Sequence, residues 1–316
     1  MEESLRIENL KAYYFVSNGI VKAVDSVSFV LHEGESLGIA GESACGKSTL
    51  GLSMMRILQP PGKIVDGKII LHGTDVLAMS EKEFTKNIRW KRMSMVFQGA
   101  MNALDPVYNV KDQLKEALMH HGFPQEKMEE RVKEAVKQVG LDPSVINRYP
   151  HELSGGMKQR IVIAMALLLR PEFVIADEPT TALDVLVQAQ IINLLKQLKK
   201  EGMTIMLITH DLAIISEIAD KVGIMYAGEI IEFGSAEQVY REPKHPYTQA
   251  LIAAIPRLRG EKKIMYVKGN PPNLLNPPKG CRFYDRCPQA MDVCKQDTPL
   301  IKIKDGYVKC WLYSNE

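Results

Sequence analysis

The stretch Gly41-Glu42-Ser43-Ala44-Cys45-Gly46-Lys47-Ser48 decides the fold of this chain, because it fits the pattern G-x-x-x-x-G-K-[ST]. The small and apolar run Ser36–Ala40 precedes it and predicts a strand. Leu50, Met54 and Leu58 follow it at helical spacing. A strand, a glycine turn and a helix in this order are the context that a phosphate-binding loop requires.

The residue types of this loop suit an anion. Glycines let the backbone curl so that successive N–H groups point inward, and the helix N-terminus adds about half a positive charge. We expect Lys47 to reach the β- and γ-phosphates of a nucleotide and Ser48 to offer its hydroxyl to Mg²⁺. A glycine turn with a surface lysine is the alternative, which the flanking strand and helix disfavour.

Length and charge narrow the class of protein. The chain has 316 residues, 40 Lys plus Arg and 38 Asp plus Glu, a net charge of +2. About two folding units are expected, and no polybasic character points to nucleic acid. The longest uncharged apolar run, Ile161–Leu169, is shorter than the roughly 20 residues of a membrane helix. The N-terminus shows no secretory signal, so we expect a reducing cytosol and no disulfides.

Strand and helix patterns alternate along the chain. Phe173–Ala176 and Thr204–Thr209 read as strands, and Val185–Lys200 between them reads as a helix. This alternation predicts a parallel sheet with helices on its faces. Residues 100–169 carry helical patterns and predict a helical subdomain. A proline-rich composition after Pro243 predicts a loop-rich C-terminal extension over residues 244–316, leaving 1–243 as the main domain.

Polar side chains follow two of the predicted strands. Asp177 and Glu178 come directly after one strand, and His210 follows the other. Open parallel sheets bind ligands at the carboxyl ends of their strands. We therefore expect Asp177 to hold Mg²⁺, Glu178 to orient or deprotonate an attacking water and His210 to assist. Asp-Glu at an ordinary surface turn is the alternative.

A second anion-receptive helix start lies in Leu153–Arg160. Ser154, Gly155 and Gly156 present a hydroxyl and free N–H groups at the beginning of a predicted helix. Taken alone, Ser154 reads as an ordinary N-cap. One chain with two phosphate-seeking termini is nevertheless a specific combination.

These motifs, in this order, resemble the ATP-binding subunits of ABC transporters over about the first 240 residues. The resemblance implies an α/β P-loop NTPase fold: a RecA-like parallel sheet core, an N-terminal antiparallel β subdomain and a helical subdomain. Leu153–Gln159 resembles the signature sequence, which in that family binds the γ-phosphate held by the partner subunit. Gln98 resembles the Q-loop residue, Asp184 belongs to a D-loop-like segment and His210 resembles the switch histidine.

The resemblance also implies an adenine-stacking aromatic at Tyr14, with Tyr13 as the neighbouring alternative. It assigns Gln98 to Mg²⁺, together with Ser48 and Asp177. The catalytic residues that we expect are Glu178, His210 and Gln98. The expected ATP-binding set is Tyr14, Gly41, Glu42, Ser43, Ala44, Cys45, Gly46, Lys47, Ser48, Thr49, Ser154, Gly155, Gly156, Gln159 and Asp184.

A narrower resemblance comes from Arg241–Thr248 and from Pro179–Val185 continuing through Val187–Gln190. Both are similar to the dipeptide/oligopeptide importer branch. Ala44 departs from the glycine common there, and Gly99-Ala100 departs from the usual acidic residue and proline. The resemblance implies an ATPase subunit that powers peptide import. Import of nickel or another small solute, a soluble ABC ATPase and a non-catalytic regulatory subunit are the alternatives.

The implied partners are two transmembrane permease subunits, a second and paralogous ATP-binding subunit in a head-to-tail dimer, and indirectly an extracytoplasmic peptide-binding protein. No nucleic acid is expected. The implied location is peripheral, on the cytoplasmic face of the cell membrane.

Four of the five cysteines lie close together near the C-terminus, and they suggest a metal centre. Their gaps are wider than the short Cys-x₂₋₄-Cys knuckles of many zinc sites, and Pro288 follows Cys287, as in the Cys-Pro step of ferredoxins. Spacing alone leaves zinc open; the resemblance to the importer branch implies a 4Fe-4S cluster. A structural staple and a redox sensor are both possible roles. The ligands would be Cys281, Cys287, Cys294 and Cys310.

Overall fold

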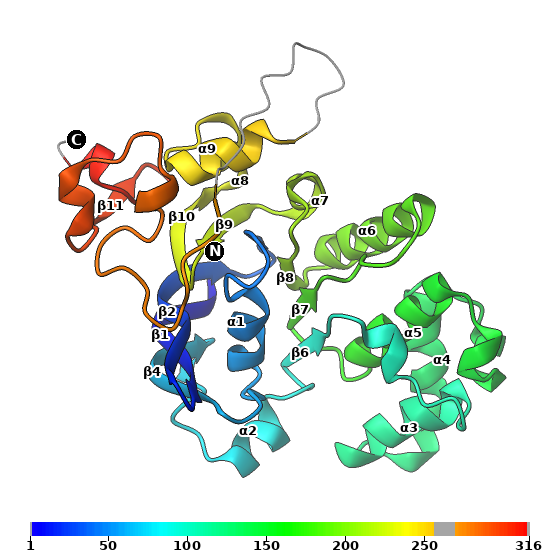
Figure 1. Ribbon diagram of the computed structural model, residues 1–316. Helices are drawn as coiled ribbons and strands as arrows, with labels where there is room; N and C mark the ends of the chain where they lie inside the picture. The colour runs from blue at the N-terminus through cyan, green and yellow to red at the C-terminus, as the bar shows by residue number, and fades with distance from the viewer. Residues whose placement is uncertain (1, 256–268, 315–316) are drawn as a thin grey trace. The chain divides into compact units, whose positions relative to one another are not determined.

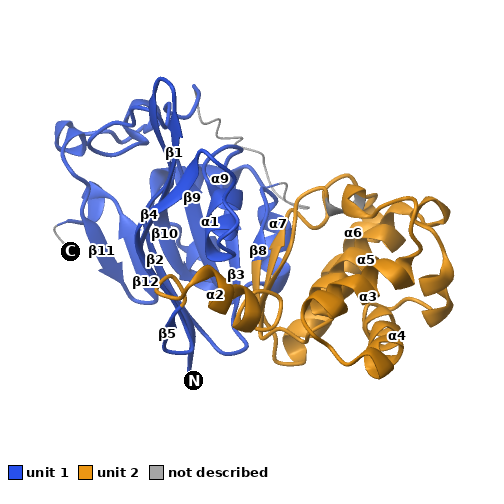
Figure 2. Cartoon of the chain, turned by 90° about the horizontal axis from the view of Figure 1, so that it is seen from below, with its two compact units in different colours: residues 1–75, 207–316 blue, residues 76–206 orange. Residues whose placement is uncertain are grey.

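The computed structural model describes residues 2–255 and 269–314, and the chain divides into two compact units. Unit 1 comprises residues 1–75 and 207–316, and unit 2 comprises residues 76–206 (Figure 2). The extension that the sequence predicts at 244–316 lies in unit 1; its residues 256–268 and 315–316 are outside the described part of the chain.

Unit 1 opens with a four-stranded antiparallel sheet in the order β2-β1-β4-β5 (Figure 1). Its two longest strands, β1 and β2, pair along the sheet, and their alternating pattern buries one face. This sheet confirms the N-terminal antiparallel β subdomain. Its strands are β1 (Glu3–Val16), β2 (Gly19–His32), β4 (Gly62–Leu71) and β5 (Thr74–Asp75).

The second sheet in unit 1 carries the phosphate loop. β3 (Ser36–Ala40) pairs in parallel with β9 (Lys221–Tyr226), and β10 (Glu229–Ser235) follows β9 as an antiparallel neighbour. All five residues of β3 are buried. The helices of unit 1 are α1 (Lys47–Met54), α7 (Leu212–Ile218), α8 (Ala236–Arg241) and α9 (Pro246–Ala253).

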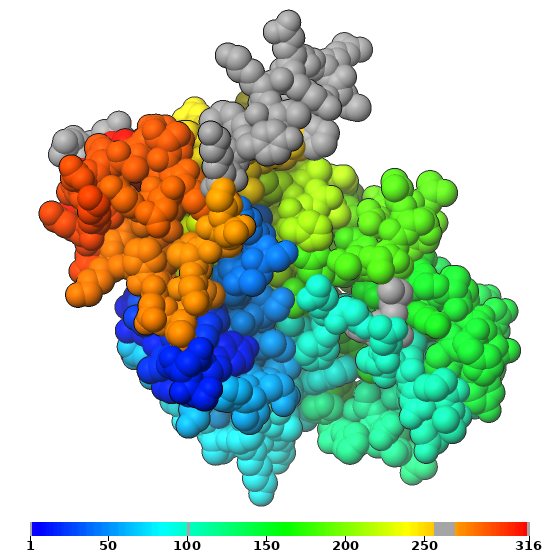
Figure 3. Space-filling model, in the orientation of Figure 1, coloured from blue at the N-terminus to red at the C-terminus, as the bar shows by residue number. Residues whose placement is uncertain are grey.

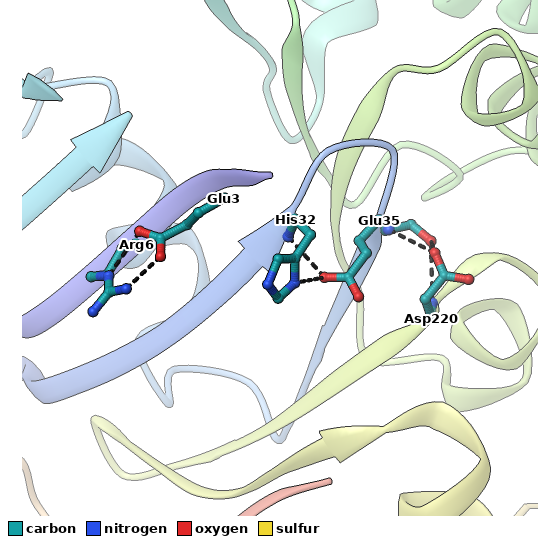
Figure 4. Close-up of polar contacts among 6 residues, drawn as sticks. Glu3, Arg6, His32, Glu35 and Asp220 are labelled. Atoms are coloured by element: carbon teal, nitrogen blue, oxygen red, sulfur yellow. Dashed lines mark hydrogen bonds and ion pairs between the residues drawn. The ribbon is translucent and has the colours of Figure 1, made fainter. Parts of the chain in front are cut away.

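A polar contact fixes where β3 and β9 begin. The backbone N–H and the hydroxyl of Ser36 both donate to Asp220 Oδ2, each at 2.9 Å, and Asp220 directly precedes β9. Figure 4 shows Asp220 beside the loop that carries the His32–Glu35 contact, with Glu3 and Arg6 on the neighbouring strand. With both parallel strands fixed at their starts, their carboxyl ends lie together at the phosphate loop.

Unit 2 contains a parallel strand pair and most of the helices. β6 (Met93–Val96) pairs in parallel with β7 (Phe173–Asp177), and both strands are fully buried. β8 (Thr204–Ile208) crosses the boundary between the units. The helices of unit 2 are α2 (Glu81–Asn87), α3 (Val110–His120), α4 (Met128–Gln138), α5 (Gly155–Leu167) and α6 (Val185–Lys200).

A buried arginine joins two of these helices. Arg131 of α4 donates to the carbonyl oxygens of Leu167 and Leu168 at the end of α5, at 2.6 and 2.7 Å. These are carbonyls that a helix end leaves without an intrahelical partner. The cation thus fixes α5, whose other end carries the signature-like residues. Within the described residues, no helix has the length and apolar character needed to cross a membrane.

The C-terminal segment completes the sheet of unit 1. β12 (Gly306–Lys309) pairs with β10, and β11 (Leu300–Ile303) pairs with β12. The Tyr307 hydroxyl donates to the Ser28 carbonyl at 2.7 Å, and the Lys22 N–H donates to the Leu274 carbonyl at 3.0 Å. The space-filling view shows this orange to red segment against the blue N-terminal strands (Figure 3). The tail gains its burial from the rest of unit 1.

Candidate functional site

The phosphate loop curls between β3 and α1 because two glycines permit it. Gly41 has φ 155° and Gly46 has φ 106°. A Cβ atom at Gly41 would lie 2.1 Å from the Met225 carbonyl oxygen, and one at Gly46 would lie 1.9 Å from that of Ala23. Only glycine fits both positions. Ala44 lies at φ 61°, so the glycine common in the importer branch would be unstrained there.

Lys47 lies within the curl of this loop. Its side chain is 7% exposed, and Nζ donates to the carbonyl oxygens of Gly41 and Glu42, each at 2.8 Å. The Cys45 thiol is 3.7 Å from Nζ. Burial raises the pKa of Cys45, against the opposing effect of Lys47. The loop therefore holds an ammonium group and a neutral thiol at the start of α1.

A chain of hydrogen bonds holds the phosphate loop through residues to which the sequence analysis gave no role. The Tyr247 hydroxyl accepts the Glu42 N–H at 3.0 Å. His245 Nδ1 accepts the Tyr247 N–H at the start of α9, and Glu232 accepts the N–H groups of Lys244 and His245 at 2.8 Å. Burial lowers the pKa of His245 to about 3 and raises that of Glu232. The importer-like motif Arg241–Thr248 was the available signal for this support.

The two candidate aromatics differ in their contacts. The Tyr14 hydroxyl lies 3.5 Å from the Thr49 hydroxyl, in the first turn of α1. The Tyr13 hydroxyl instead donates to Asp25 at 2.6 Å, and burial raises its pKa. Tyr14 is thus the one tied to the helix that follows the phosphate loop. His210, also in unit 1, is exposed after β8.

In unit 2, β7 delivers two carboxylates to its end. Asp177 is 3% exposed and is the last residue of the strand. Glu178 follows at φ 49°, a left-handed conformation that costs a residue with a Cβ atom, and its carboxylate accepts the Thr181 hydroxyl at 2.7 Å. Because of this turn, the Glu178 side chain leaves the backbone in another direction than the side chains of β7 do. Gln98, beyond β6, is exposed.

Unit 2 also brings the signature-like and D-loop-like segments together. The Ser154 hydroxyl caps α5 by accepting the Met157 N–H at 3.3 Å, and Asp184 caps α6 by accepting the Val187 N–H at 2.9 Å. A Cβ atom at Gly156 would lie 2.6 Å from a Val187 methyl group, so the two helix starts pack closely. Gln159 is buried, whereas Ser154 and Gly155 are exposed.

The expected site residues thus divide between the units. Unit 1 carries the phosphate loop, Tyr14, Thr49 and His210. Unit 2 carries Gln98, Asp177, Glu178, the Ser154 segment and Asp184. Unit 1 carries N–H donors and a cation, which suit phosphate, and unit 2 carries carboxylates, which suit Mg²⁺, and a second helix start.

The four tail cysteines lie in unit 1 as free thiols. Burial raises the pKa of Cys281 to about 12 and that of Cys310 to about 11, and the other tail thiols add to both shifts. Across residues 2–255 and 269–314, no three or more His, Cys, Asp and Glu side chains are arranged to hold a metal ion. The expected cluster therefore has no preformed cage in the described residues.

A glycine loop between a buried strand and a helix, with a lysine in its curl and a strand ending in two carboxylates, defines a P-loop nucleotide-binding protein. Comparisons with known proteins narrow this class. Residues 24–181 match the family described as ABC transporter, and residues 231–294 match the C-terminal region of oligopeptide/dipeptide transporters.

Curated relatives cover nearly the whole chain. The dipeptide transport ATP-binding protein DppD of Caldanaerobacter subterraneus is 44% identical, over 98% of this chain and 97% of its own length. The oligopeptide transport ATP-binding protein OppD of Escherichia coli is 46% identical, over 96% and 91%.

Solved structures agree in fold. A dimeric ATP-binding cassette in a post-hydrolysis state, bound to ADP and phosphate, is 28% identical with a TM-score of 0.65; the match covers 73% of this chain and 98% of that one. The cbiO1 protein of Clostridium perfringens, part of an ABC transporter complex, is 30% identical with a TM-score of 0.66, over 76% and 92%. The chain belongs to the ABC transporter family, in its dipeptide/oligopeptide-type branch of ATP-hydrolysing proteins.

Proposed function

We propose that this chain is the ATP-hydrolysing subunit of an importer for dipeptides or oligopeptides, and that it acts at the cytoplasmic face of the membrane beneath two separate permease subunits. The observation that carries the proposal is the near full-length similarity to peptide-transport ATP-binding proteins, together with the match of its C-terminal region to a family described by the same substrates. Import of nickel or another small solute is the alternative.

The phosphate chemistry follows from the residues of both units. Lys47 and the N–H groups of its loop would bind the triphosphate, while Tyr14 would stack on adenine. Ser48, Asp177 and Gln98 offer hydroxyl, carboxylate and amide oxygens, a donor set that suits Mg²⁺, which when bound would neutralise charge on the phosphate oxygens. Glu178 would accept the proton of the attacking water, and His210 would help to orient that water.

The second helix start is proposed to serve a partner chain. Ser154 and Gly155 are exposed at the start of α5, and next to them Val185 and Leu186 are 79% and 77% exposed although both are apolar. Exposed apolar side chains beside free N–H groups suit a protein surface that also contacts an anion. In a head-to-tail dimer, preferably with a paralogous ATP-binding subunit, this surface would cover the partner's phosphate loop and exclude water.

Co-purification tests the transport assignment. The chain with an affinity tag is isolated from membranes in detergent, the permease subunits are identified by mass spectrometry, and ATPase activity is measured with the extracytoplasmic binding protein loaded with peptides or with nickel chelates. We expect two permease subunits and stimulation by peptides. Stimulation by nickel chelates alone, or no membrane partner, would contradict the peptide assignment.

We further propose that the four tail cysteines hold a 4Fe-4S cluster. The backbone N–H groups of Phe283, Gln289 and Leu312 lower the pKa of Cys281, Cys287 and Cys310, against the larger effect of burial. Hydrogen bonds to sulfur stabilise thiolates and cluster-bound sulfur.

A cavity of about 130 Å³ adjoins two of the four tail cysteines. It is bounded in part by Cys281 and Cys294, and the backbone N–H of Cys281 donates to the Cys294 carbonyl at 2.8 Å. The raised thiol pKa values mean that ligation must displace protons, which metal binding does. The fit requires the thiols to rotate toward a common centre, since no cage is preformed in the described residues.

Metal analysis after anaerobic purification tests this proposal. We expect about four iron and four sulfide per chain, and loss of both in Cys287→Ser. The Cys45→Ser variant, whose thiol lies in the phosphate loop, is the matched control and should keep the iron. One zinc per chain without iron would replace the cluster with a zinc site, and a folded chain with neither metal would refute both.

A further inference from the structure

The segment that joins the first two tail cysteines, Cys281–Cys287, packs in unit 1 next to the phosphate loop. Arg282 is buried, forms ion pairs with Asp25 and Glu229, and donates to the Ala227 carbonyl at 2.5 Å. It anchors this seven-residue segment between β2 and β10.

Phe283 extends the anchor with apolar contacts. Its ring centroid lies 5.3 Å from that of Tyr226 and 5.4 Å from that of Tyr247, and all three rings are fully buried. Tyr247 is the residue whose hydroxyl accepts the Glu42 N–H of the loop. The tail and the loop therefore share one aromatic cluster.

Arg286 makes the direct contact with the phosphate loop. Nη1 and Nη2 each donate to one carboxylate oxygen of Glu42 at 2.9 Å, and Nη1 also donates to the Tyr226 hydroxyl at 3.1 Å. The Arg286 side chain is 6% exposed and that of Glu42 is 26% exposed. A bidentate, largely desolvated pair of this kind is geometrically specific and stronger than a surface ion pair.

The Arg286–Glu42 ion pair neutralises a negative charge that would weaken ATP binding at the loop. Glu42 is its second residue, and a carboxylate in an anion-binding loop repels the triphosphate that the loop must bind. The Glu42 charge acts on groups inside the loop. Burial is the main cause of the raised pKa of Cys45 and Lys47 opposes it, while the Glu42 carboxylate raises this pKa further. A guanidinium group stays charged in proteins, so the compensating charge of Arg286 is permanent.

We propose that Arg286 is a positioning residue for ATP binding: it neutralises and holds the Glu42 carboxylate, so that the cysteine-bearing C-terminal segment forms part of the nucleotide site. This inference rests on ATP binding at the loop. It depends neither on the transported solute nor on the presence of a cluster.

Affinity for a non-hydrolysable ATP analogue tests the proposal, measured by calorimetry on the full-length chain. Arg286→Ala leaves one uncompensated negative charge, and we expect about tenfold weaker binding. Glu42→Gln leaves one uncompensated positive charge, and we expect tighter binding. The double variant restores neutrality and should bind within about twofold of the unsubstituted chain.

Two further readouts separate this role from general support of the fold. In steady-state ATPase assays of the assembled complex, Arg286→Ala should raise KM for ATP with kcat little changed, and Arg286→Lys should retain most of the affinity. Arg282→Ala is the matched control, because Arg282 anchors the same segment without touching the loop. Adding Glu42→Gln to Arg282→Ala should change the affinity by the same factor as Glu42→Gln does alone, because the two positions are not coupled.

Failure of Glu42→Gln to restore affinity in folded Arg286→Ala protein would overturn the proposal. If Arg286→Ala does not fold, the single Glu42→Gln variant remains decisive, and unchanged or weaker binding by that variant would equally overturn it.

Discussion

Glu178 and Ala44 both adopt left-handed backbone conformations, at φ 49° and 61°. Such conformations cost about 1–2 kcal/mol for a residue with a Cβ atom, and they persist where the surrounding structure imposes them. At Glu178 the turn redirects a carboxylate away from the strand, which suits the role that we propose for it, accepting a proton from an attacking water. The conformation at Ala44 belongs to the curl of the phosphate loop.

Replacing Glu178 by Gln removes the proposed proton acceptor and keeps the phosphate loop. We expect ATP turnover to fall at least about a hundredfold, because general bases contribute about 10²- to 10⁴-fold, while ATP affinity stays within a few fold. Phosphate-release assays and calorimetry measure the two quantities. Lys47→Ala is the contrasting variant and should lose nucleotide binding itself. Normal turnover in Glu178→Gln would remove Glu178 from its role.

At this scale the sequence predicted much. The loop glycines, Lys47 and the strand-end acids follow a fixed spacing with a known chemical reason. In the structure the glycines and Lys47 lie between β3 and α1 or at the start of α1, and the acids lie at the end of β7. Contacts between distant residues were not predictable in the same way. Arg286 and Glu42 lie 244 positions apart, and no local pattern in the sequence connects Arg286 with the phosphate loop.

Among the elements, buried strands and amphipathic helices were predicted best. The expected strand Ser36–Ala40 and the expected helix Val185–Lys200 match β3 and α6, because continuous apolar runs and helical periodicity are local signals. The tail strands β11 and β12 were missed. They are only four residues each, and β12 is held by pairing with β10, a contact that local sequence does not encode.

The free energy of unfolding should depend on pH through His245, the N-cap residue of helix α9. Burial lowers the pKa of His245 to about 3 in the folded chain, against about 6.5 when unfolded. Between these values the unfolded chain binds the proton more readily, so stability falls as pH falls from about 6.5 toward 3. At pH 5 the loss is about 2 kcal/mol from this group alone.

The matched variant for this test is His245→Asn, which keeps a side-chain acceptor for the Tyr247 N–H and does not titrate. We expect urea unfolding to show the unsubstituted chain losing about 2 kcal/mol more than His245→Asn between pH 8 and pH 5. Parallel pH profiles for the two proteins would show that His245 does not contribute this sensitivity.

For the molecule as a whole, the chain carries two sets of groups that we propose bind phosphate. The loop around Lys47 offers a cation and N–H donors, and the start of α5 offers Ser154 and further N–H groups beside exposed Val185 and Leu186. The related cassette bound to ADP and phosphate is a dimer. Both observations support a nucleotide site that is completed only when a second ATP-binding chain contributes its own α5 start.

ATPase activity as a function of protein concentration, with sedimentation of the same samples, measures this requirement for pairing. Specific activity should be low where the chain is monomeric and should rise as dimers form. Ser154→Arg should stay inactive at every concentration while it still binds ATP at Lys47. Full turnover by a strictly monomeric chain, retained in Ser154→Arg, would contradict the shared site.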